Sequence, residues 1–485
     1  MEFCDLPEHI FLLILSFLPL VDAIRLCSCC KEWRNHWTHC NIIELDRSKF
    51  EYEVREAHFP NGIRTYIAAY VHKLLPLLVK PELDCIKLRL SYEEDASKDK
   101  SFFENLLGFA AAKMVKEIHI DLSDARMLHL FRRFLRPTVE SFSSVYSLSY
   151  SIYNVTSLRV LSLRCCGLSN FNFELKFMQL TSLSFDGMFV TNQIILNLGS
   201  NCPNLENLSI VDCYLGRDHF QFHAAWSKLK RLTIKGARPY LAWLELFVPR
   251  IQYLEIQTFM YSVRLGNLQT LVEAVLDLEN QMKYGYQAIN IMEFIFLGFK
   301  WAKRLTLNHR LLEVLLCDDH IMLHETHPDN LDYFSHIVSC KFTLLLENLE
   351  HLILRTPLEG LALGGAFLIL RSASNLKSVS VDTEYGIVAV NAQEVTIEGF
   401  IGDNDQMDFI EYLLRNSVTL KKVFISFPKS FPLPTEEIET LIKWTMKELE
   451  KIECYVLSIS VVLVFQTDVQ VCFPVNAFMN INSVF

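Results

Sequence analysis

Three groups of side chains in this chain have the types and spacings that bind metal ions. The group nearest the N-terminus combines a Cys-x-x-Cys spacing with two histidines and a further cysteine, at Cys27, Cys30, His36, His39 and Cys40. Thiolates and imidazoles are preferred ligands of Zn²⁺. The two pairs lie much closer together in sequence than the pairs of a zinc finger. We therefore interpret these cysteines as core thiols and the histidines as surface residues.

A second group of histidines and carboxylates lies farther along the chain, at Asp318, Asp319, His320, His324 and His327. His320 and His324 would share one face of a helix. Pro328 follows them, and the H-E-x-x-H motif of a catalytic zinc site is absent. We expect a solvated insertion loop here.

The third group, Asp403, Asn404, Asp405 and Asp408, has the carboxylate spacing of a calcium loop. The glycine at position six and the glutamate at position twelve of such a loop are both missing. The chain also lacks a G-x-S-x-G elbow, a P-loop, a G-x-G-x-x-G turn and a kinase signature. We expect no catalytic residue, no cofactor and no metal, and a binding surface in their place.

The bulk properties narrow the class of protein. With 485 residues the chain exceeds what one compact core usually organises, which indicates several domains or a repeat array. The formal net charge of −10 and the lack of a basic stretch argue against a nucleic-acid partner. The 14 cysteines are spread thinly and no signal peptide precedes them, which favours reduced thiols.

The N-terminus contains a strongly apolar helix signal. Pro7 and Pro19 flank a run from Glu8 to Phe17 whose large apolar side chains would surround most of a helix. Acidic residues precede the run, so it lacks the charge of a signal peptide, and it is too short to span a bilayer. We expect a cytoplasmic and/or nuclear protein with no membrane partner, in which another protein covers this helix.

The same segment resembles the F-box, a short helical module that binds the Skp-type adaptor of a cullin-based ubiquitin ligase. The matching residues are Leu6, Pro7, Ile10, Ile14, Leu15, Ser16, Phe17, Leu18, Pro19, Asp22, Ala23, Arg25, Ser28, Trp33, Arg34 and Trp37. The variant with ILSFLP, DA and WRxxW is most similar to the large plant family of F-box proteins. The alternative is an N-terminal hairpin of the main domain. The resemblance implies adaptor contacts at Leu6, Pro7, Ile10, Ile14, Leu15, Leu18, Pro19, Arg25, Trp33 and Trp37.

A leucine-rich repeat organises the middle of the chain. The template L-x-x-L-x-L-x-x-N/C-x-L is matched at every anchor from Leu158 to Leu168 and again from Leu205 to Leu215. Weaker copies complete a series with steps of 22, 25, 24 and 22 residues between the middle anchors Leu161, Leu183, Leu208, Leu232 and Leu254. Such repeats have a period of roughly 20–29 residues. Stacked repeats would form a curved solenoid with a parallel sheet on its concave face.

Looser copies extend the series in both directions, with an insertion at about residues 313–348. Upstream lie Ile118 and a strand from Ile86 to Leu90, and the downstream middle anchors are Ala274, Leu305, Leu352, Val379, Val395 and Val423. Because side chains alternate along a strand, the residues between the anchors face the concave side. There we expect a target-binding surface of small polar residues and charges of both signs: Ser162, Arg164, Ser184, Asp186, Ser209, Val211, Thr233, Lys235, Glu255, Gln257, Thr306, Asn308, Ile353 and Arg355.

The C-terminal region begins with a strand-helix-strand pattern. It starts at Glu394, and Phe409 and Ile410 supply the apolar helix face before a strand that begins at Leu420. This pattern resembles the FBD region of many plant F-box proteins, and we interpret it as a modified repeat that closes the solenoid. The nearly all-apolar segment from Val456 to Phe465 either pairs as an extra strand or is an ill-packed extension.

These patterns together predict an α/β protein. We place an F-box at 1–45, a capping connector of helices and strands at 46–110, the leucine-rich-repeat solenoid at 111–390, an FBD-like closing unit at 391–455 and an apolar tail at 456–485. The resemblance implies a non-catalytic substrate-recognition subunit of a Skp-cullin-F-box ubiquitin ligase, in which the repeats bind a target protein. Two alternatives stay open: an F-box-carrying ligand sensor or enzyme with a pocket in the solenoid, and a scaffold that never turns over a target.

Overall fold

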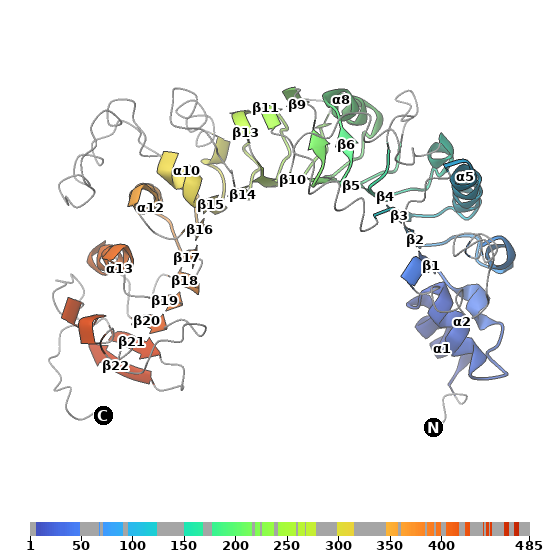
Figure 1. The fold of residues 1–485 in the computed structure, drawn as a ribbon, viewed down its shortest axis with the longest axis horizontal. Coiled ribbons are helices and arrows are strands. Elements are labelled where there is room, and N and C mark those ends of the chain that lie inside the picture. The colour runs from blue at the N-terminus through green and yellow to red at the C-terminus, as the bar shows by residue number, and fades with distance from the viewer. Residues whose placement is uncertain are drawn as a thin grey trace. The chain divides into compact units, whose positions relative to one another are not determined.

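The computed structural model describes residues 6–48, 67, 71–90, 96–123, 150–167, 177–215, 219–223, 226–236, 241–258, 260–266, 268–277, 298–314, 346–356, 360–383, 386–391, 394–398, 404–416, 422–426, 440, 443–445, 447–448, 460–464 and 470–474. The chain divides into two compact units, Met1–Ile251 and Gln252–Phe485. Figure 1 labels the elements of both units, and each unit is considered by itself.

The N-terminal module begins with two short helices, α1 (Glu8–Ser16) and α2 (Leu20–Ser28). Pro7 and Pro19 are their N-cap residues, each with a φ of −59°. Proline is tolerated there because its fixed φ suits the start of a helix and the missing N–H would have had no intrahelical partner. A 3-10 helix, η2 (His36–His39), follows. The helix predicted from Glu8 to Phe17 is confirmed and ends one residue earlier.

Seven described strands of the first unit form one parallel ladder, in the same order as in the chain. They are β1 (Ile42–Asp46), β2 (Cys85–Arg89), β3 (Glu117–Asp121), β4 (Val160–Arg164), β5 (Ser182–Asp186), β7 (Asn207–Val211) and β10 (Arg231–Lys235). Their second residues pair in register and are buried: Ile43, Ile86, Ile118, Leu161, Leu183, Leu208 and Leu232. The predicted alignment of the middle anchors is therefore confirmed. The ladder also includes β1 and β2, which lie before residue 111.

Helices and short strands form a second layer in this unit. Two helices, α5 (Ala96–Ala112) and α8 (Asn192–Asn201), lie on the same side of the ladder (Figure 1). The other elements are η3 (Leu75–Leu77), η4 (Tyr150–Asn154), the parallel pair β6 (Phe189–Val190) and β8 (Tyr214–Leu215), and the parallel pair β9 (His219–Phe222) and β11 (Leu241–Leu246). Gly199 lets α8 approach Trp226 closely, since a Cβ there would lie 2.7 Å from the indole Nε1.

Four neighbouring strands of this ladder end in the same backbone turn. Cys165, Gly187, Asp212 and Gly236 directly follow β4, β5, β7 and β10, and their φ angles are 53°, 59°, 49° and 59°. The N–H groups of the first three donate to the last carbonyl of the next strand at 2.9–3.0 Å. This left-handed conformation, which most L-residues avoid, turns the chain off the sheet. Two features favour glycine at position 236. Its φ is positive, and a Cβ there would collide with the Asp212 carboxylate.

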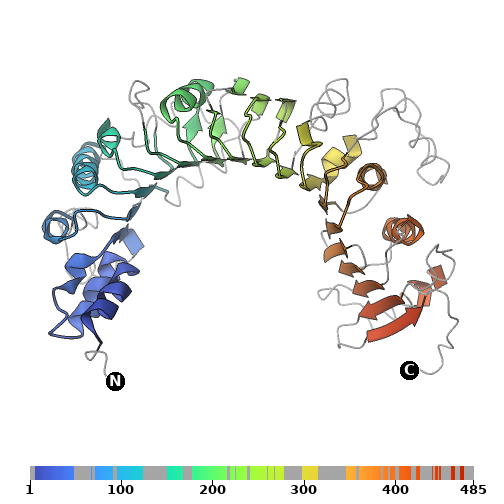
Figure 2. The ribbon, with the colours of Figure 1, turned by 180° about the vertical axis from the view of Figure 1, so that it is seen from behind.

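The second unit contains its own parallel ladder. Its strands are β12 (Tyr253–Gln257), β14 (Glu273–Asp277), β15 (Arg304–Asn308), β16 (His351–Arg355) and β17 (Ser378–Thr383), and β13 (Met260–Leu265) lies outside it. The predicted middle anchors pair in register: Leu254 from the regular series, and Ala274, Leu305, Leu352 and Val379 from the looser copies. Two helices, α10 (His309–Val314) and α12 (Gly360–Ser372), lie on one side of the ladder (Figure 2).

An antiparallel strand separates this ladder from the closing unit. β18 (Gly386–Asn391) runs antiparallel to both β17 and β19 (Glu394–Glu398). The repeat pattern did not predict β18. Parallel strands need a crossover of about a dozen residues or more, whereas only two residues separate β17 from β18, so the chain returns antiparallel.

The closing unit has the predicted strand-helix-strand order. β19 pairs in parallel with β20 (Lys422–Ser426), and α13 (Asn404–Asn416) connects them. The apolar tail then supplies two further strands. β21 (Ser460–Val464) is parallel to β20, and β22 (Gln470–Pro474) is antiparallel to β21. Of the two interpretations of the tail, the extra strand is confirmed.

Most of the predicted insertion, residues 315–345 with the second histidine group, lies outside the described residues. No helix in the described part of the chain is long and apolar enough to cross a membrane.

Candidate functional site

One face of α1 exposes a stripe of large apolar side chains. Ile10, Leu13 and Phe17 are 36%, 54% and 72% exposed, and their i, i+3, i+7 spacing places them on the same side of the helix. Phe11 and Leu15, in contrast, are fully buried. The stripe therefore leaves three large apolar side chains accessible on one side of α1. Ile10 was among the predicted adaptor contacts, whereas Leu13 and Phe17 were not.

Aromatic packing determines which face of α1 turns outward. Phe11 stacks on the buried Trp33 with ring centroids 4.4 Å apart, and His36 meets Trp33 edge-on at 4.8 Å. The Nε2 of His36 lies 3.3 Å from the Glu8 carboxylate at the start of α1. These contacts hold one side of α1 against the following segment, which leaves the stripe exposed.

The predicted adaptor residues divide into three groups by exposure. Leu15 and Trp33 are buried, so they belong to the core of the helical module. The exposed members are Pro7, Ile10 and Arg25. The half-buried members are Leu6, Ile14, Leu18, Pro19 and Trp37.

The ladder of the first unit presents a row of hydroxyl groups on the face opposite its anchors. This hydroxyl row consists of the third residues of four adjacent strands, Ser162, Ser184, Ser209 and Thr233, which pair in register. All four are half-buried. Because their side chains are small, a partner molecule can approach the sheet closely along this row.

A row of alternating charges runs beside the hydroxyl row. It is formed by the last residues of β1 to β5, Asp46, Arg89, Asp121, Arg164 and Asp186. Arg89 lies 3.3 Å from the carboxylates of both neighbours, and Arg164 lies 3.8 Å from Asp121 and 3.3 Å from Asp186. Burial raises the pKa of Asp186, and Arg164 opposes that rise. Each arginine of this charged row lies between two carboxylates, and the three aspartates outnumber the two arginines by one. Of these residues, the sequence analysis predicted only Arg164 and Asp186, as target contacts.

Some residues predicted on the open face are buried instead. Glu255 and Asn308 are 7% and 4% exposed, and Thr306 is buried as well. The Glu255 carboxylate accepts hydrogen bonds from the Tyr253 hydroxyl at 2.9 Å and from Gln257 at 3.1 Å. The Asn308 amide oxygen accepts from the backbone N–H of Leu311 in α10, and its Nδ2 donates to Asp277 at 2.8 Å. The prediction that these three are accessible was wrong, because local hydrogen bonding and packing enclose them.

The remaining predicted face residues are at least partly accessible where the structure describes them. Val211, Lys235, Gln257 and Arg355 are half-buried, and Ile353 is 40% exposed.

Nine cysteines whose side chains the structure describes are free thiols, and eight of these are buried, with Cys29 exposed. Cys27, Cys30 and Cys40 lie in the core of the N-terminal module, as interpreted from their spacing. In the third metal-type group, Asn404, Asp405 and Asp408 belong to α13, so this stretch is helix rather than a calcium loop.

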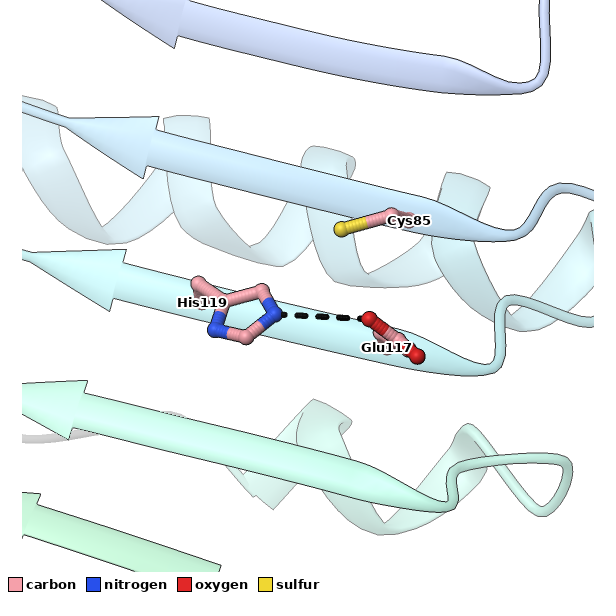
Figure 3. A group of neighbouring side chains, drawn as sticks. All are labelled: Cys85, Glu117 and His119. Carbon is pink, nitrogen blue, oxygen red and sulfur yellow. Dashed lines mark ion pairs between the residues drawn. The ribbon is translucent and has the colours of Figure 1, made fainter. Parts of the chain in front are cut away.

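One group of possible metal ligands does occur among the described residues, at a place that no motif indicated. The ligand atoms of Cys85, Glu117 and His119 all lie within 4.8 Å of one another (Figure 3). Burial raises the pKa of the Cys85 thiol to about 11, although the nearby Lys87 lowers it. At neutral pH the thiol by itself is therefore protonated.

Two family models match this chain. The model of the F-box domain matches residues 3–45, which include α1, α2 and η2. The FBD model matches residues 393–425, which include β19, α13 and most of β20.

Relatives from Arabidopsis thaliana match much more of the chain. F-box/LRR-repeat protein At3g26922 is 28% identical over 279 residues, which are 56% of this chain and 80% of the relative. F-box/FBD/LRR-repeat protein At2g26030 is 21% identical over 459 residues, or 88% of this chain and 92% of the relative. F-box/FBD/LRR-repeat protein At5g18770 is 23% identical over 437 residues, with 87% and 83% covered.

The helical segment that matches the F-box domain precedes parallel ladders of short leucine-rich strands, which is the combination that the names of the F-box/LRR-repeat relatives describe. The FBD and the relatives narrow this combination further. The chain is homologous to plant F-box/FBD/LRR-repeat proteins, and the resemblance found in its sequence is confirmed.

Proposed function

We propose that this protein is the substrate-recognition subunit of a Skp-cullin-F-box ubiquitin ligase. Its F-box binds the Skp-type adaptor, and through it a cullin, while the open face of the ladder binds a target protein. The chain itself performs no catalysis, since ubiquitin transfer belongs to the other subunits. Its contribution is proximity, which raises the effective concentration of the target near the transferring enzyme.

The exposed stripe on α1 is the observation that carries this proposal. Ile10, Leu13 and Phe17 form an exposed apolar surface inside the segment that matches the F-box domain. Burying a large apolar side chain contributes roughly 1.5–3 kcal/mol. Three of them at the centre of an interface are sufficient to anchor a partner.

Truncation of the stripe tests adaptor binding. Leu13→Ala combined with Phe17→Ala removes about 2 kcal/mol or more of binding free energy, so co-purification of a Skp-type adaptor should fall at least about tenfold. Both side chains are exposed, and the thermal midpoint of the free chain should stay unchanged. The matched control is Met178→Ala, which shortens a side chain that is 55% exposed outside the F-box.

A second variant probes the contacts that the sequence implied. Leu6→Ala with Pro7→Ala should weaken adaptor binding by a similar factor, because both residues are accessible beside α1. If both double variants fold and retain full adaptor binding, the assignment of this surface is wrong.

The target surface is best assigned to the hydroxyl row and its surroundings. A stable complex buries on the order of 1,200–2,000 Å² in total, which several adjacent strands supply together. The sequence suggests charge reversal at Arg164, Lys235 and Glu255 as a test of target binding. These substitutions would change the stability of the fold as well as target binding. Arg164 belongs to the charged row, and Glu255 is buried and hydrogen-bonded.

A further inference from the structure

A thiol, an imidazole and a carboxylate meet on the open face of the first ladder. Cys85 is the first residue of β2 and pairs in register with Glu117, the first residue of β3, and His119 lies two positions farther along β3 on the same face. Figure 3 shows the three side chains close together, with the His119 Nε2 3.6 Å from the Glu117 carboxylate. The register of two neighbouring strands thus gathers three potential ligands from positions far apart in sequence.

The three donors form a ligand set suited to zinc. Zn²⁺ binds thiolate, imidazole and carboxylate at about 2.0–2.3 Å, usually with tetrahedral geometry. Tetrahedral ligands at these bond lengths lie roughly 3.3–3.8 Å apart. The present separations are within 4.8 Å. The donors therefore need to close by at most about 1–1.5 Å. His119 and Glu117 are 34% and 47% exposed, which gives their side chains the freedom to do so.

The surroundings are compatible with a bound cation. The positively charged Lys87 lies on this face and pairs in register with His119. Because Lys87 is exposed, its ammonium group can extend into solvent, away from a bound cation. Glu44 pairs in register with Lys87 and balances its charge. Asp84 is also near the thiol but is engaged by Lys116 at 3.1 Å. The carboxylate of Glu117 therefore gives the site its own negative charge.

We propose that Cys85, Glu117 and His119 form a three-ligand site for Zn²⁺, with the fourth position open to solvent. Binding converts the Cys85 thiol to a thiolate and releases its proton to water. The metal then connects β2 to β3, next to β1, the strand at the end of the segment that matches the F-box domain. This role is separate from adaptor and target binding and does not depend on them.

Cobalt substitution of the full-length chain provides the direct test. After treatment with a chelator, added Co²⁺ should bind at one equivalent per chain and produce the absorption of tetrahedral cobalt with a thiolate-to-metal charge-transfer band. Replacing a residue that only hydrogen-bonds to a metal ligand costs roughly 10–100-fold in metal affinity, so losing a ligand itself should cost about 100-fold or more. Cys85→Ser should remove the charge-transfer band, and His119→Ala should weaken binding by that factor.

Matched variants separate this site from other metal-binding side chains. Cys29→Ser removes an exposed thiol and His219→Ala removes an exposed imidazole on another strand, and neither should change cobalt binding. His119→Cys supplies a different ligand at the same place and should restore binding. His119 is partly exposed, so its variants test the proposal even if Cys85→Ser does not fold.

Zinc should also raise the thermal midpoint of the wild-type chain and leave that of His119→Ala unchanged, because a ligand that binds only the folded state stabilises it. Absence of saturable cobalt binding, or equal binding by the wild type and His119→Ala, would overturn the proposal.

Discussion

Removing Arg164 should reveal the charged row as a set of coupled interactions. Its guanidinium lies between two carboxylates, 3.8 Å from Asp121 and 3.3 Å from Asp186. Arg164→Ala deletes both ion pairs and leaves the two carboxylates without the cation between them. The variant should therefore lose stability although the substituted residue lies on the open face.

The magnitude follows from the exposure of the partners. The side chains of Arg164, Asp186 and Asp121 are 38%, 31% and 18% exposed, so solvent screens both pairs considerably. Ion pairs of this kind contribute roughly 0.2–1 kcal/mol each. We expect Arg164→Ala to lower the free energy of unfolding of the first unit by about 1–2 kcal/mol, at the upper end of two such pairs.

The loss should depend on pH, and the pKa of Asp186 determines the direction. Burial raises this pKa above its ordinary value of 3.8, while Arg164 lowers it, so removing Arg164 raises it further. A carboxyl group whose folded-state pKa lies above its unfolded-state pKa reduces stability at pH values above the folded-state pKa. Protonation relieves this cost as the pH falls. The loss of unfolding free energy caused by Arg164→Ala should therefore be largest near neutral pH. It should shrink as the pH falls through the raised pKa of Asp186 toward 3.8.

A double-mutant cycle measures the coupling directly. Thermal or urea midpoints of Arg164→Ala, Asp186→Ala and the double variant, measured from pH 7 down to about pH 4, should give an interaction energy of about 0.5–1 kcal/mol at neutral pH. Ser162→Ala, in the same strand and in the hydroxyl row, is the control and should be nearly neutral. Strict additivity, or a deficit that does not change with pH, would refute this account of the charged row.

Two further predictions concern the target surface and the packing of α8. Ser184→Trp should block target recruitment while leaving adaptor binding and the thermal midpoint intact. The control is Ser200→Trp, at an exposed position in α8, which should have no effect. Co-precipitation of the target with each variant measures the difference. Gly199→Ala should lower stability by about 1–3 kcal/mol, because its Cβ would meet the Trp226 ring at 2.7 Å. Gly108→Ala, a helical glycine with nothing within 4 Å, should be neutral or slightly stabilising in the same thermal denaturation.

Periodic and local features of this fold were predictable from the sequence. The spacing of Leu161, Leu183 and Leu208 specified the register of their strands, because each repeat must bury the same anchor position between the ladder and its outer layer. Pro7 and Pro19 marked the two ends of the apolar run that forms α1 in the same local way. The FBD pattern was equally readable as strand, helix and strand.

The antiparallel strand β18 was missed because its direction depends on connection length rather than on side-chain pattern. Its continuous apolar run, Ile387 to Val390, does not by itself reveal the direction of the strand. The step from Val379 to Val395 is 16 residues, shorter than the roughly 20–29 of a repeat, and this was the available signal.

The sequence by itself determined the F-box, the repeat register and the closing unit, since these follow from local and periodic constraints that each segment carries alone. Only the tertiary structure decided which side chains meet across strands. Register between neighbouring strands brings together the alternating charges from Asp46 to Asp186 and the group of Cys85, Glu117 and His119. Long connections of unequal length separate these strands in the sequence. Packing of Phe11 against Trp33 likewise decided which face of an almost entirely apolar helix remains exposed. Contacts of this kind depend on the stacking of whole repeats, and no single repeat encodes them.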